Sequence, residues 1–475
     1  MAEDIVIGLE VHVQLKTKTK LFCSCSNRFG DEPNANTCPV CMGLPGVLPV
    51  FNRRVLDYAL LAAGALNCEI QDKMKFDRKN YYYPDLPKAY QISQFDMPLA
   101  LDGELEVEVD GEKTKIGIER VHLEEDAGKL IHASIGNESY VDYNRTGTPL
   151  IEIVSRPDIT SPVQAEAYLR SLKQRMEYLG ISDCNMDEGS LRCDANLSIR
   201  NSDGSLGTKT EIKNMNSFKG VRVALQHEAA RQRRVISRGE KIVQGTRLWD
   251  ESARETRPMR SKEEAHDYRY FPEPDLVPVV IDPGYRDEVL AELPEMPEAR
   301  QRRFVEEYNL PVDDAGILTS TRPMADFYER AVENDCDTKT LSNLMIADLR
   351  RELNERNWVL SDVAMTPEAL ASLAVLLDDD VISSNVASEL VGELVESGGD
   401  PRRIVEERGL KQISDEGELD AIIKEVTAEN PEAVEDIRSG KEQAIGFLVG
   451  QVMQKSKGQA NPARAKEMLH EEILS

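Results

Sequence analysis

The chain has 475 residues, a formal net charge of −27, and a hydrophobic content of 40%. It is too long for one hydrophobic core, so we expect two to four domains. No apolar run approaches the roughly 20 residues of a membrane-spanning helix, and the first residues do not resemble a secretory signal. These features argue against a membrane-spanning or secreted protein and make the cytoplasm the expected location.

The acidic charge favours cationic partners or a high-salt cell interior over general nucleic-acid binding. Basic residues are nevertheless concentrated in residues 219–241 and near the C-terminus, where they are Lys455, Lys457, Arg464 and Lys466. Each group is either a solvated helix face or a contact to RNA, and the charge pattern leaves both open.

Residues 5–15 alternate between apolar and polar side chains, which predicts a half-buried strand. Glu10 and His12 are two residues apart, so they point to the same face of that strand. An acid and an imidazole in this arrangement suit a divalent metal ion, although a solvent-facing strand would also carry such residues.

Four cysteines form two close pairs across a short loop: Cys23, Cys25, Cys38 and Cys41. With no export signal a disulfide framework is not expected, and four soft sulfur ligands suit a tetrahedral zinc ion. The alternative is a group of buried thiols. We call residues 23–41 the cysteine knuckle.

Next in the chain, Asn52 is expected to cap a helix, and residues 76–91 form a segment rich in tyrosine, lysine and proline. That composition favours an ordered loop at a polar cleft. Asp110-Gly111 predicts a hairpin turn between two strands, and Gly136-Asn137 a second turn. Between the turns, three consecutive acids (residues 124–126) precede Gly-Lys, a set that suits magnesium beside a phosphate.

Residues 142–158 combine a polar turn with a strand. Arg145 offers a planar fork for a phosphate or carboxylate, Gly147 allows close approach of the backbone, and Glu152 lies within the aliphatic strand 150–154. The plain alternative is a hairpin corner with an exposed arginine and glutamate.

A helix is expected from Pro162 to about Gly180, followed by strands near 187–199 and 209–217. Six acids then fall in segments predicted to be strands or strand edges: Glu10, Glu124, Glu125, Glu152, Asp194 and Glu211. If these strands pack together, the acids repel each other unless metal ions relieve the charge. The pattern therefore favours a catalytic cleft.

Beyond residue 282 the sequence predicts short-linked helices throughout. We expect an α+β domain at 1–290, an all-α helical domain at 291–405 and a small helical tail domain at 406–475.

Several stretches together resemble the GatB/GatE family, the B subunits of aspartyl/glutamyl-tRNA amidotransferases. The resemblance covers nearly the whole chain and is carried by IGLEVHVQL (7–15), CPVCMGLPGVLPVFN (38–52), FDRKNYYYPDLPKAYQISQ (76–94), HLEEDAGK (122–129), DYNRTGTPLIEIVSRPD (142–158), EGSLRCDANLSIR (188–200), TEIKNMNSF (210–218) and GFLVGQVMQKSKGQANP (446–462). The related archaeal protein has an inserted domain for which the 267–311 connection leaves no room.

The resemblance implies an antiparallel-sheet cradle similar to the glutamine synthetase catalytic fold. It also implies a two-step reaction, in which ATP phosphorylates the side-chain carboxylate of an aspartate or glutamate misacylated on tRNA and ammonia then displaces the phosphate. No amidase signature is visible, so ammonia is expected from a separate amidase chain, and a third, small chain is expected to complete a heterotrimer. The tail is expected to contact tRNA through Lys455 and Lys457.

The resemblance also implies residue roles. The expected catalytic residues are Glu10, His12, Glu124, Glu125, Arg145, Glu152 and Lys209. The expected magnesium ligands are Glu10, His12, one or both of Glu124 and Glu125, Asp194 and Glu211, whereas zinc rests on the four cysteines. Contacts to the nucleotide phosphates or to incoming ammonia are expected from Lys79, Lys88, Arg145 and Lys209. The rival function is a zinc-bearing RNA adaptor without catalysis, which has no need for the dispersed acids.

Overall fold

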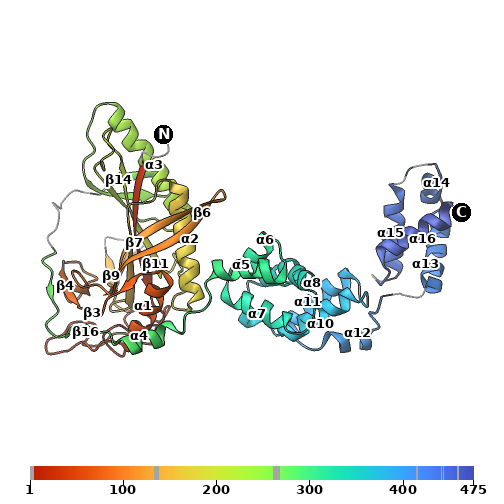
Figure 1. Ribbon diagram of the computed structural model, residues 1–475, viewed down its shortest axis with the longest axis horizontal. Coiled ribbons are helices and arrows are strands. Elements are labelled where there is room, and N and C mark those ends of the chain that lie inside the picture. Colours follow the sequence, from red (N-terminus) through yellow and green to blue (C-terminus); the bar gives the residue numbers. More distant parts are fainter. Residues whose placement is uncertain are drawn as a thin grey trace. The chain divides into compact units, whose positions relative to one another are not determined.

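The computed structural model describes residues 5–132, 138–259, 268–412, 416–439, 441, 443–456 and 459–474. The predicted turn at Gly136-Asn137 and the basic residue Lys457 lie outside these ranges. The chain forms two compact units, Met1–Met296 and Pro297–Ser475, whose elements are labelled in Figure 1. No described helix is long and apolar enough to cross a membrane.

A nine-stranded sheet forms the centre of the first unit. Neighbouring strands are antiparallel except for β12 and β13, which are parallel. In spatial order the strands are β14 (Glu255–Pro258), β13 (Gly245–Asp250), β12 (Thr210–Lys213), β11 (Leu191–Ile199), β1 (Ile5–Gln14), β10 (Pro149–Ser155), β7 (Glu112–Glu125), β6 (Ala100–Val109) and β2 (Glu69–Ile70). The predicted α+β class is confirmed, as is the hairpin turn between β6 and β7.

Three helices share one hydrophobic core with this sheet: α1 (Arg53–Ala65), α2 (Pro162–Tyr178) and α3 (Phe218–Ser237). The side chains of Asn52, Ser161 and Ser217 cap them by accepting a hydrogen bond from a backbone N–H of the first turn. In β1, alternate apolar residues such as Leu9 and Val11 are fully buried. The other face of β1 carries the polar side chains, so the sheet has one face for the core and one for chemistry.

The remaining elements of the first unit lie outside the nine-stranded sheet. They are β3 (Lys73–Met74) paired with β16 (Val279–Val280), β4 (Asp77–Asn80) paired with β5 (Tyr90–Ser93) and β15 (Phe271–Pro272), β8 (Lys129–His132) paired with β9 (Ser139–Asp142), and α4 (Pro283–Leu290). The tyrosine-rich segment is therefore not one continuous loop as predicted. Its two ends pair as strands β4 and β5, and only residues 81–89 connect them.

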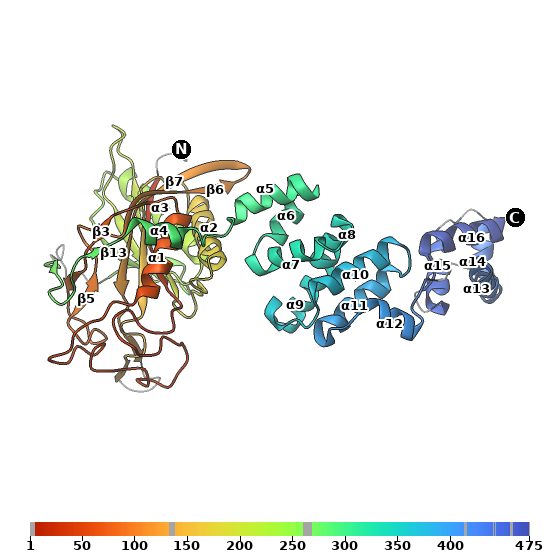
Figure 2. The same ribbon diagram turned by 60° about the horizontal axis from the view of Figure 1, so that its bottom comes forward.

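The second unit is helical in its described residues, as predicted (Figure 2). One hydrophobic cluster joins α5 (Pro297–Tyr308), α6 (Val312–Leu318), α7 (Arg322–Val332), α8 (Thr338–Asn343), a π-helix (Leu344–Leu349), α9 (Arg350–Arg356), α10 (Pro367–Asp378), α11 (Ser384–Ser397) and α12 (Pro401–Arg408), with a 3-10 turn at Leu360–Asp362. A separate cluster joins α13 (Glu416–Glu429), α14 (Pro431–Arg438), α15 (Ala444–Lys455) and α16 (Pro462–Leu474). The expected domain boundaries at about 290 and 405 stay predictions.

Candidate active site

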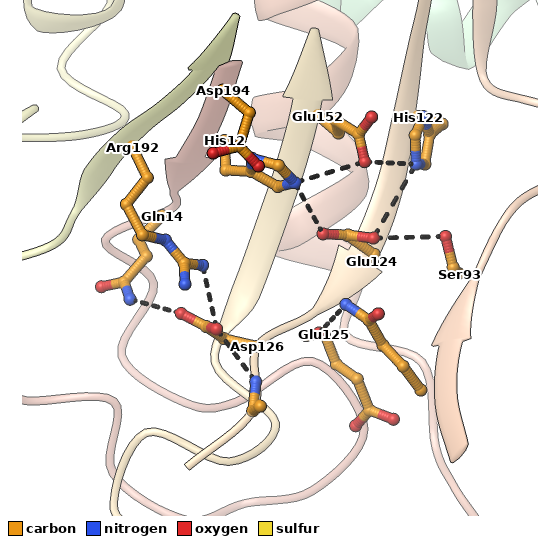
Figure 3. Close-up of polar contacts among 12 residues, drawn as sticks. His12, Gln14, Ser93, His122, Glu124, Glu125, Asp126, Glu152, Arg192 and Asp194 are labelled. Atoms are coloured by element: carbon orange, nitrogen blue, oxygen red, sulfur yellow. Dashed lines mark hydrogen bonds and ion pairs between the residues drawn. The ribbon is translucent and has the colours of Figure 1, made fainter. Parts of the chain in front are cut away.

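Strand register brings distant polar residues together on the open face of the sheet. His12 on β1 lies opposite Glu152 on β10 and Arg192 on β11, and Glu152 lies opposite His122 on β7. In the next row, Glu10 lies opposite Asp194. We call the polar side chains of these rows, together with Glu124 and Glu211, the polar band. Figure 3 shows the part of it around His12, Glu124 and Glu152.

Two histidines and two glutamates form the most enclosed part of the polar band. The Nε2 atom of His12 lies 3.3 Å from Glu152 Oε2 and 3.5 Å from Glu124 Oε1, and His122 Nε2 lies 3.3 Å from Glu152 Oε2. The potential ligand atoms of His12, Glu124 and Glu152 all lie within 4.8 Å of one another. Imidazole nitrogen with carboxylate oxygens is a donor set that binds divalent cations.

The charges of this cluster are tightly coupled. Burial opposes protonation of both histidines, but Glu152 and Glu124 outweigh burial, so the pKa of His12 is raised and that of His122 rises to about 9. Burial likewise opposes ionisation of Glu152, yet the two histidines hold its pKa well below the ordinary value. The carboxylates are therefore kept ionised and ready to bind a cation.

Lys79 on β4 contributes a cation to the same cluster. Its Nζ atom lies 4.9 Å from the ring centre of Tyr268. Burial opposes its charge, but Glu124 and Glu152 act against that, and the pKa of Lys79 is raised. Lys79, for which the sequence predicted a contact to phosphate or ammonia, therefore acts on Glu124 and Glu152 from strand β4.

A second group of acids lies on β1, β11 and β12. Lys213 Nζ lies 2.6 Å from Asp194 Oδ2 and 3.0 Å from Glu211 Oε1, and Asn196 donates a hydrogen bond of 2.9 Å to Glu10. Burial and the neighbouring carboxylates, Glu152 first, raise the pKa of Glu10. These acids lie together as predicted, and Lys213 already compensates part of their charge.

A cavity of about 300 Å³ opens next to this second group. It is lined by Gly8, Glu10, Asn196 and Lys209, among others. Burial would raise the pKa of Glu211, but Lys213, then the hydrogen bond from Thr246, and last the exposed Lys209 lower it. The predicted phosphate-contacting lysine therefore stands at a cavity beside the acids.

Asp126 is the centre of a third polar group. It accepts a hydrogen bond of 2.8 Å from Gln14 and lies 2.9 Å from Arg192 Nη2 and 3.5 Å from Arg145 Nε. Burial would raise the pKa of Asp126, but the two arginines lower it. Arg145 also donates to the carbonyl oxygens of Ala127 and Gly128, so most of its fork is used within the protein.

Glu125 does not lie with the other acids. Its side chain points away from the His12 cluster in Figure 3. Glu125 pairs with Lys88 and accepts a hydrogen bond of 3.0 Å from the backbone of Ile92. The pair lines a cavity of about 180 Å³ beside Cys41 and Gly147. Of the two consecutive glutamates, Glu124 is the one positioned for the expected metal.

The cysteine knuckle brings its four sulfur atoms within 4.8 Å of one another. Cys41 is buried, and a hydrogen bond from Cys23 is the largest of several effects that lower the pKa of its thiol. Four cysteine sulfurs at this spacing suit tetrahedral zinc. The structure thus provides a site compatible with a structural zinc ion.

Sequence reasoning assigned no role to His122, Gln14, Arg192 or Lys213, all of which belong to these groups. Period-two alternation was the available signal, since residues 120, 122 and 124 must share one face of β7. The same rule places Glu125 on the opposite face. Alternation could therefore have placed His122 beside Glu124 in advance.

Two family models match most of the chain. A family model described as the GatB/GatE catalytic domain matches residues 5–287, and a GatB domain model matches residues 326–473. The chain belongs to the GatB/GatE family. The polar band of this family member lies entirely within the catalytic-domain match.

Its relatives include proteins named as the B subunit of aspartyl/glutamyl-tRNA(Asn/Gln) amidotransferase. The one from Carboxydothermus hydrogenoformans is 56% identical, covering 99% of this chain and 98% of the relative. Those from Moorella thermoacetica and Brevibacillus brevis are 53% and 52% identical, covering 100% and 99% of each chain. The resemblance inferred from the sequence is confirmed.

Proposed function

We propose that the chain is the B subunit of a tRNA-dependent amidotransferase. Its substrate is aspartate carried by tRNA(Asn), glutamate carried by tRNA(Gln), or both, and its reaction is that of an ATP-dependent carbon–nitrogen ligase. Family membership supports the reaction class. The observation that carries the assignment of the active site is the polar band, in which His12, Glu124 and Glu152 converge from three adjacent strands.

Phosphoryl transfer from ATP to a carboxylate brings two anions together, so catalysis depends on cations and on positioning. His12, Glu124 and Glu152 would hold one Mg²⁺, and Glu10, Asp194 and Glu211 a second. When bound, Mg²⁺ supplies the charge that neutralises the phosphates and the carboxylate. The first donor set fits, because the potential ligand atoms of His12, Glu124 and Glu152 all lie within 4.8 Å of one another. In the second set, Lys213 pairs with Asp194 and Glu211, so a metal ion would have to displace this lysine from the two carboxylates.

The chain's own residues have three tasks in this reaction. Lys209 contacts nucleotide phosphates at the 300 Å³ cavity beside Glu10. Lys79 and Arg192 offset charge at the reacting carboxylate, since both act electrostatically on Glu124 or its neighbours. Asp126 fixes the side chains of Arg192 and Arg145. Arg145 is thus mainly a positioning residue.

Ammonia is proposed to arrive from a partner amidase chain by way of Lys88 and Glu125. These side chains are paired, buried and polar, and they line a cavity separate from the one at Lys209. A third, small chain completes the proposed heterotrimer, and the cytoplasm is the proposed location. The first domain (1–290) is proposed to be a cradle of the glutamine synthetase type with a structural zinc.

tRNA is proposed to bind the tail domain (406–475), with the helical domain (291–405) connecting it to the cradle. The separate hydrophobic cluster of α13 to α16 supports an independently packed tail. Lys455 on α15 pairs with Glu425 and Glu429 at 2.8 Å each. To contact tRNA as the sequence predicts, Lys455 would have to exchange these two glutamates for a phosphate group.

The proposed function is tested by His12→Ala and Glu211→Gln in the chain assembled with its partner chains. Both variants should lose ATP-dependent amidation of misacylated tRNA by at least about a hundredfold, because a lost charge contact in a transition state is worth several kcal/mol. tRNA binding, measured separately, should be unchanged. Glu108→Gln, an exposed acid on β6, is the matched control.

Amidation at the wild-type rate in both variants would contradict the catalytic assignment. It would favour the rival function, a zinc-bearing RNA adaptor. Running the assay with Asp-tRNA(Asn) and Glu-tRNA(Gln) separately also identifies the preferred substrate.

A further inference from the structure

Lys20 is a fully buried lysine beside the cysteine knuckle. Its side chain has 0% exposure, although lysine is almost never fully buried unless it is paired. The Nζ atom donates to the carbonyl oxygens of Asn36 at 2.7 Å and Tyr143 at 3.4 Å, and it lies 3.7 Å from Cys41 Sγ. No carboxylate among the described residues forms an ion pair with it.

The two carbonyl groups provide hydrogen bonds but no negative charge. A buried ammonium without an anion costs several kcal/mol, so this environment is unfavourable unless an anion is present. The Cys41 sulfur is the group in contact that can supply one. Four thiolates around one Zn²⁺ leave two negative charges uncompensated, and a buried ammonium offsets one of them.

We propose that Lys20 is the counter-ion of the metal centre in the cysteine knuckle. This inference rests on the zinc ion of the proposed function and goes beyond it, because it assigns a residue outside the four ligands. Groups that contact metal ligands set the affinity of the site for its metal. Lys20 is therefore a positioning residue of the metal site.

Lys20 also lies between the cysteine knuckle and residues 143–147, which precede strand β10 of the polar band. Lys20 lies against Gly147, which has φ +83°, and a Cβ atom there would come within 3.5 Å of Cys41 Cβ and 3.6 Å of Lys20 Cδ. Leu21 donates a backbone hydrogen bond of 2.9 Å to the carbonyl of Gly147. The backbone N–H of Asn36 donates a hydrogen bond of 2.8 Å to the side-chain Oδ1 atom of Asn144. These contacts hold the knuckle against residues 143–147, which lead directly into β10 and Glu152.

The test uses the full-length chain and measures its affinity for zinc. Lys20→Met keeps the length of the side chain and removes the charge. Lys18→Met, at an exposed position two residues away, is the matched control. In competition with a chromogenic chelator, Lys20→Met should bind zinc at least about tenfold more weakly than wild type, a typical effect of losing a partner of a metal ligand. Lys18→Met should bind as wild type does.

Lys20→Gln separates charge from hydrogen bonding, because its amide still donates to the carbonyl groups of Asn36 and Tyr143. The same loss of zinc affinity is expected in this variant, which also serves if Lys20→Met does not fold. Wild-type affinity in Lys20→Gln overturns the counter-ion role while leaving the zinc centre intact. If the wild-type chain binds no zinc, both the zinc centre and the counter-ion role of Lys20 are wrong. Amidation by that zinc-free chain would show that the proposed reaction does not depend on either.

Discussion

At the scale of single residues, two acids adjacent in the sequence occupy different environments. Glu124 faces His12 and His122, whereas Glu125 pairs with Lys88. Alternation along β7 could have separated them in advance. The pairing of Glu125 with Lys88 could not be read from the sequence, because it depends on how the β4–β5 hairpin packs against β7. Residue type indicated an acidic pair, and packing decided which of the two acids lies beside the histidines.

Asp126 provides a test at this scale. Its carboxylate holds Arg192 and Arg145, so Asp126→Asn leaves two guanidinium groups without their shared anion. We expect kcat/KM for ATP-dependent amidation to fall at least about tenfold, equivalent to about 1.4 kcal/mol of transition-state stabilisation. Steady-state kinetics with the assembled complex measure this.

Circular dichroism checks that the Asp126→Asn chain is folded, and Glu108→Gln again serves as the control. An unchanged kcat/KM in the folded variant would show that the two arginines do not need Asp126 for catalysis.

At the scale of elements, local signals predicted most strands and helices. Asn52 and Ser161 mark helix starts because their side chains accept backbone N–H groups. Sheet order had no local signal. β1 pairs with β10 and β11, which bring His12 together with Glu152 and Arg192 across long stretches of chain. Such pairing follows from burial of the apolar face that the strands share. The sequence therefore indicated that acids would gather on the sheet, but not which residues would lie opposite one another.

Glu228 on α3 tests the packing of an element. It is fully buried, accepts hydrogen bonds from Arg231, Gln232 and Thr256, and thereby ties α3 to β14. Burial would raise the pKa of Glu228, but Arg231 and Gln232 lower it. A carboxyl with a lowered pKa stabilises the fold above its unfolded pKa of about 4.3, and this stabilisation disappears as the pH falls through the folded pKa.

We therefore expect Glu228→Gln to lower the free energy of unfolding by about 2 kcal/mol at pH 7, since hydrogen bonds to a charged group are lost. The difference from wild type should shrink once the pH falls below about 4. Urea unfolding followed by fluorescence measures it, because Trp249 on β13 lies opposite Thr256, which donates a hydrogen bond to Glu228. Glu240→Gln, at an exposed position, is the control, and a difference that does not change with pH would contradict the role given to Glu228.

At the scale of the whole molecule, the chain combines a unit in which residues 5–287 match the family's catalytic-domain model with a helical unit that contains the second match. Chain length predicted several domains, and the sequence pattern predicted helices beyond residue 282. It did not predict the number of cavities around the sheet. The cavity at Lys209 and the cavity at Lys88 are distinct, and we propose that nucleotide and ammonia use different entrances to the polar band.

The most direct test of the polar band as the active site replaces glutamine with free ammonium in the amidation assay of the assembled complex. His12→Ala should be inactive with either nitrogen source, because it cannot activate the carboxylate. Lys88→Met should lose glutamine-dependent amidation by at least about tenfold while keeping ammonium-dependent amidation near the wild-type rate. If His12→Ala amidates at the wild-type rate when ammonium is supplied, the polar band is not the site of carboxylate activation and the central claim is wrong.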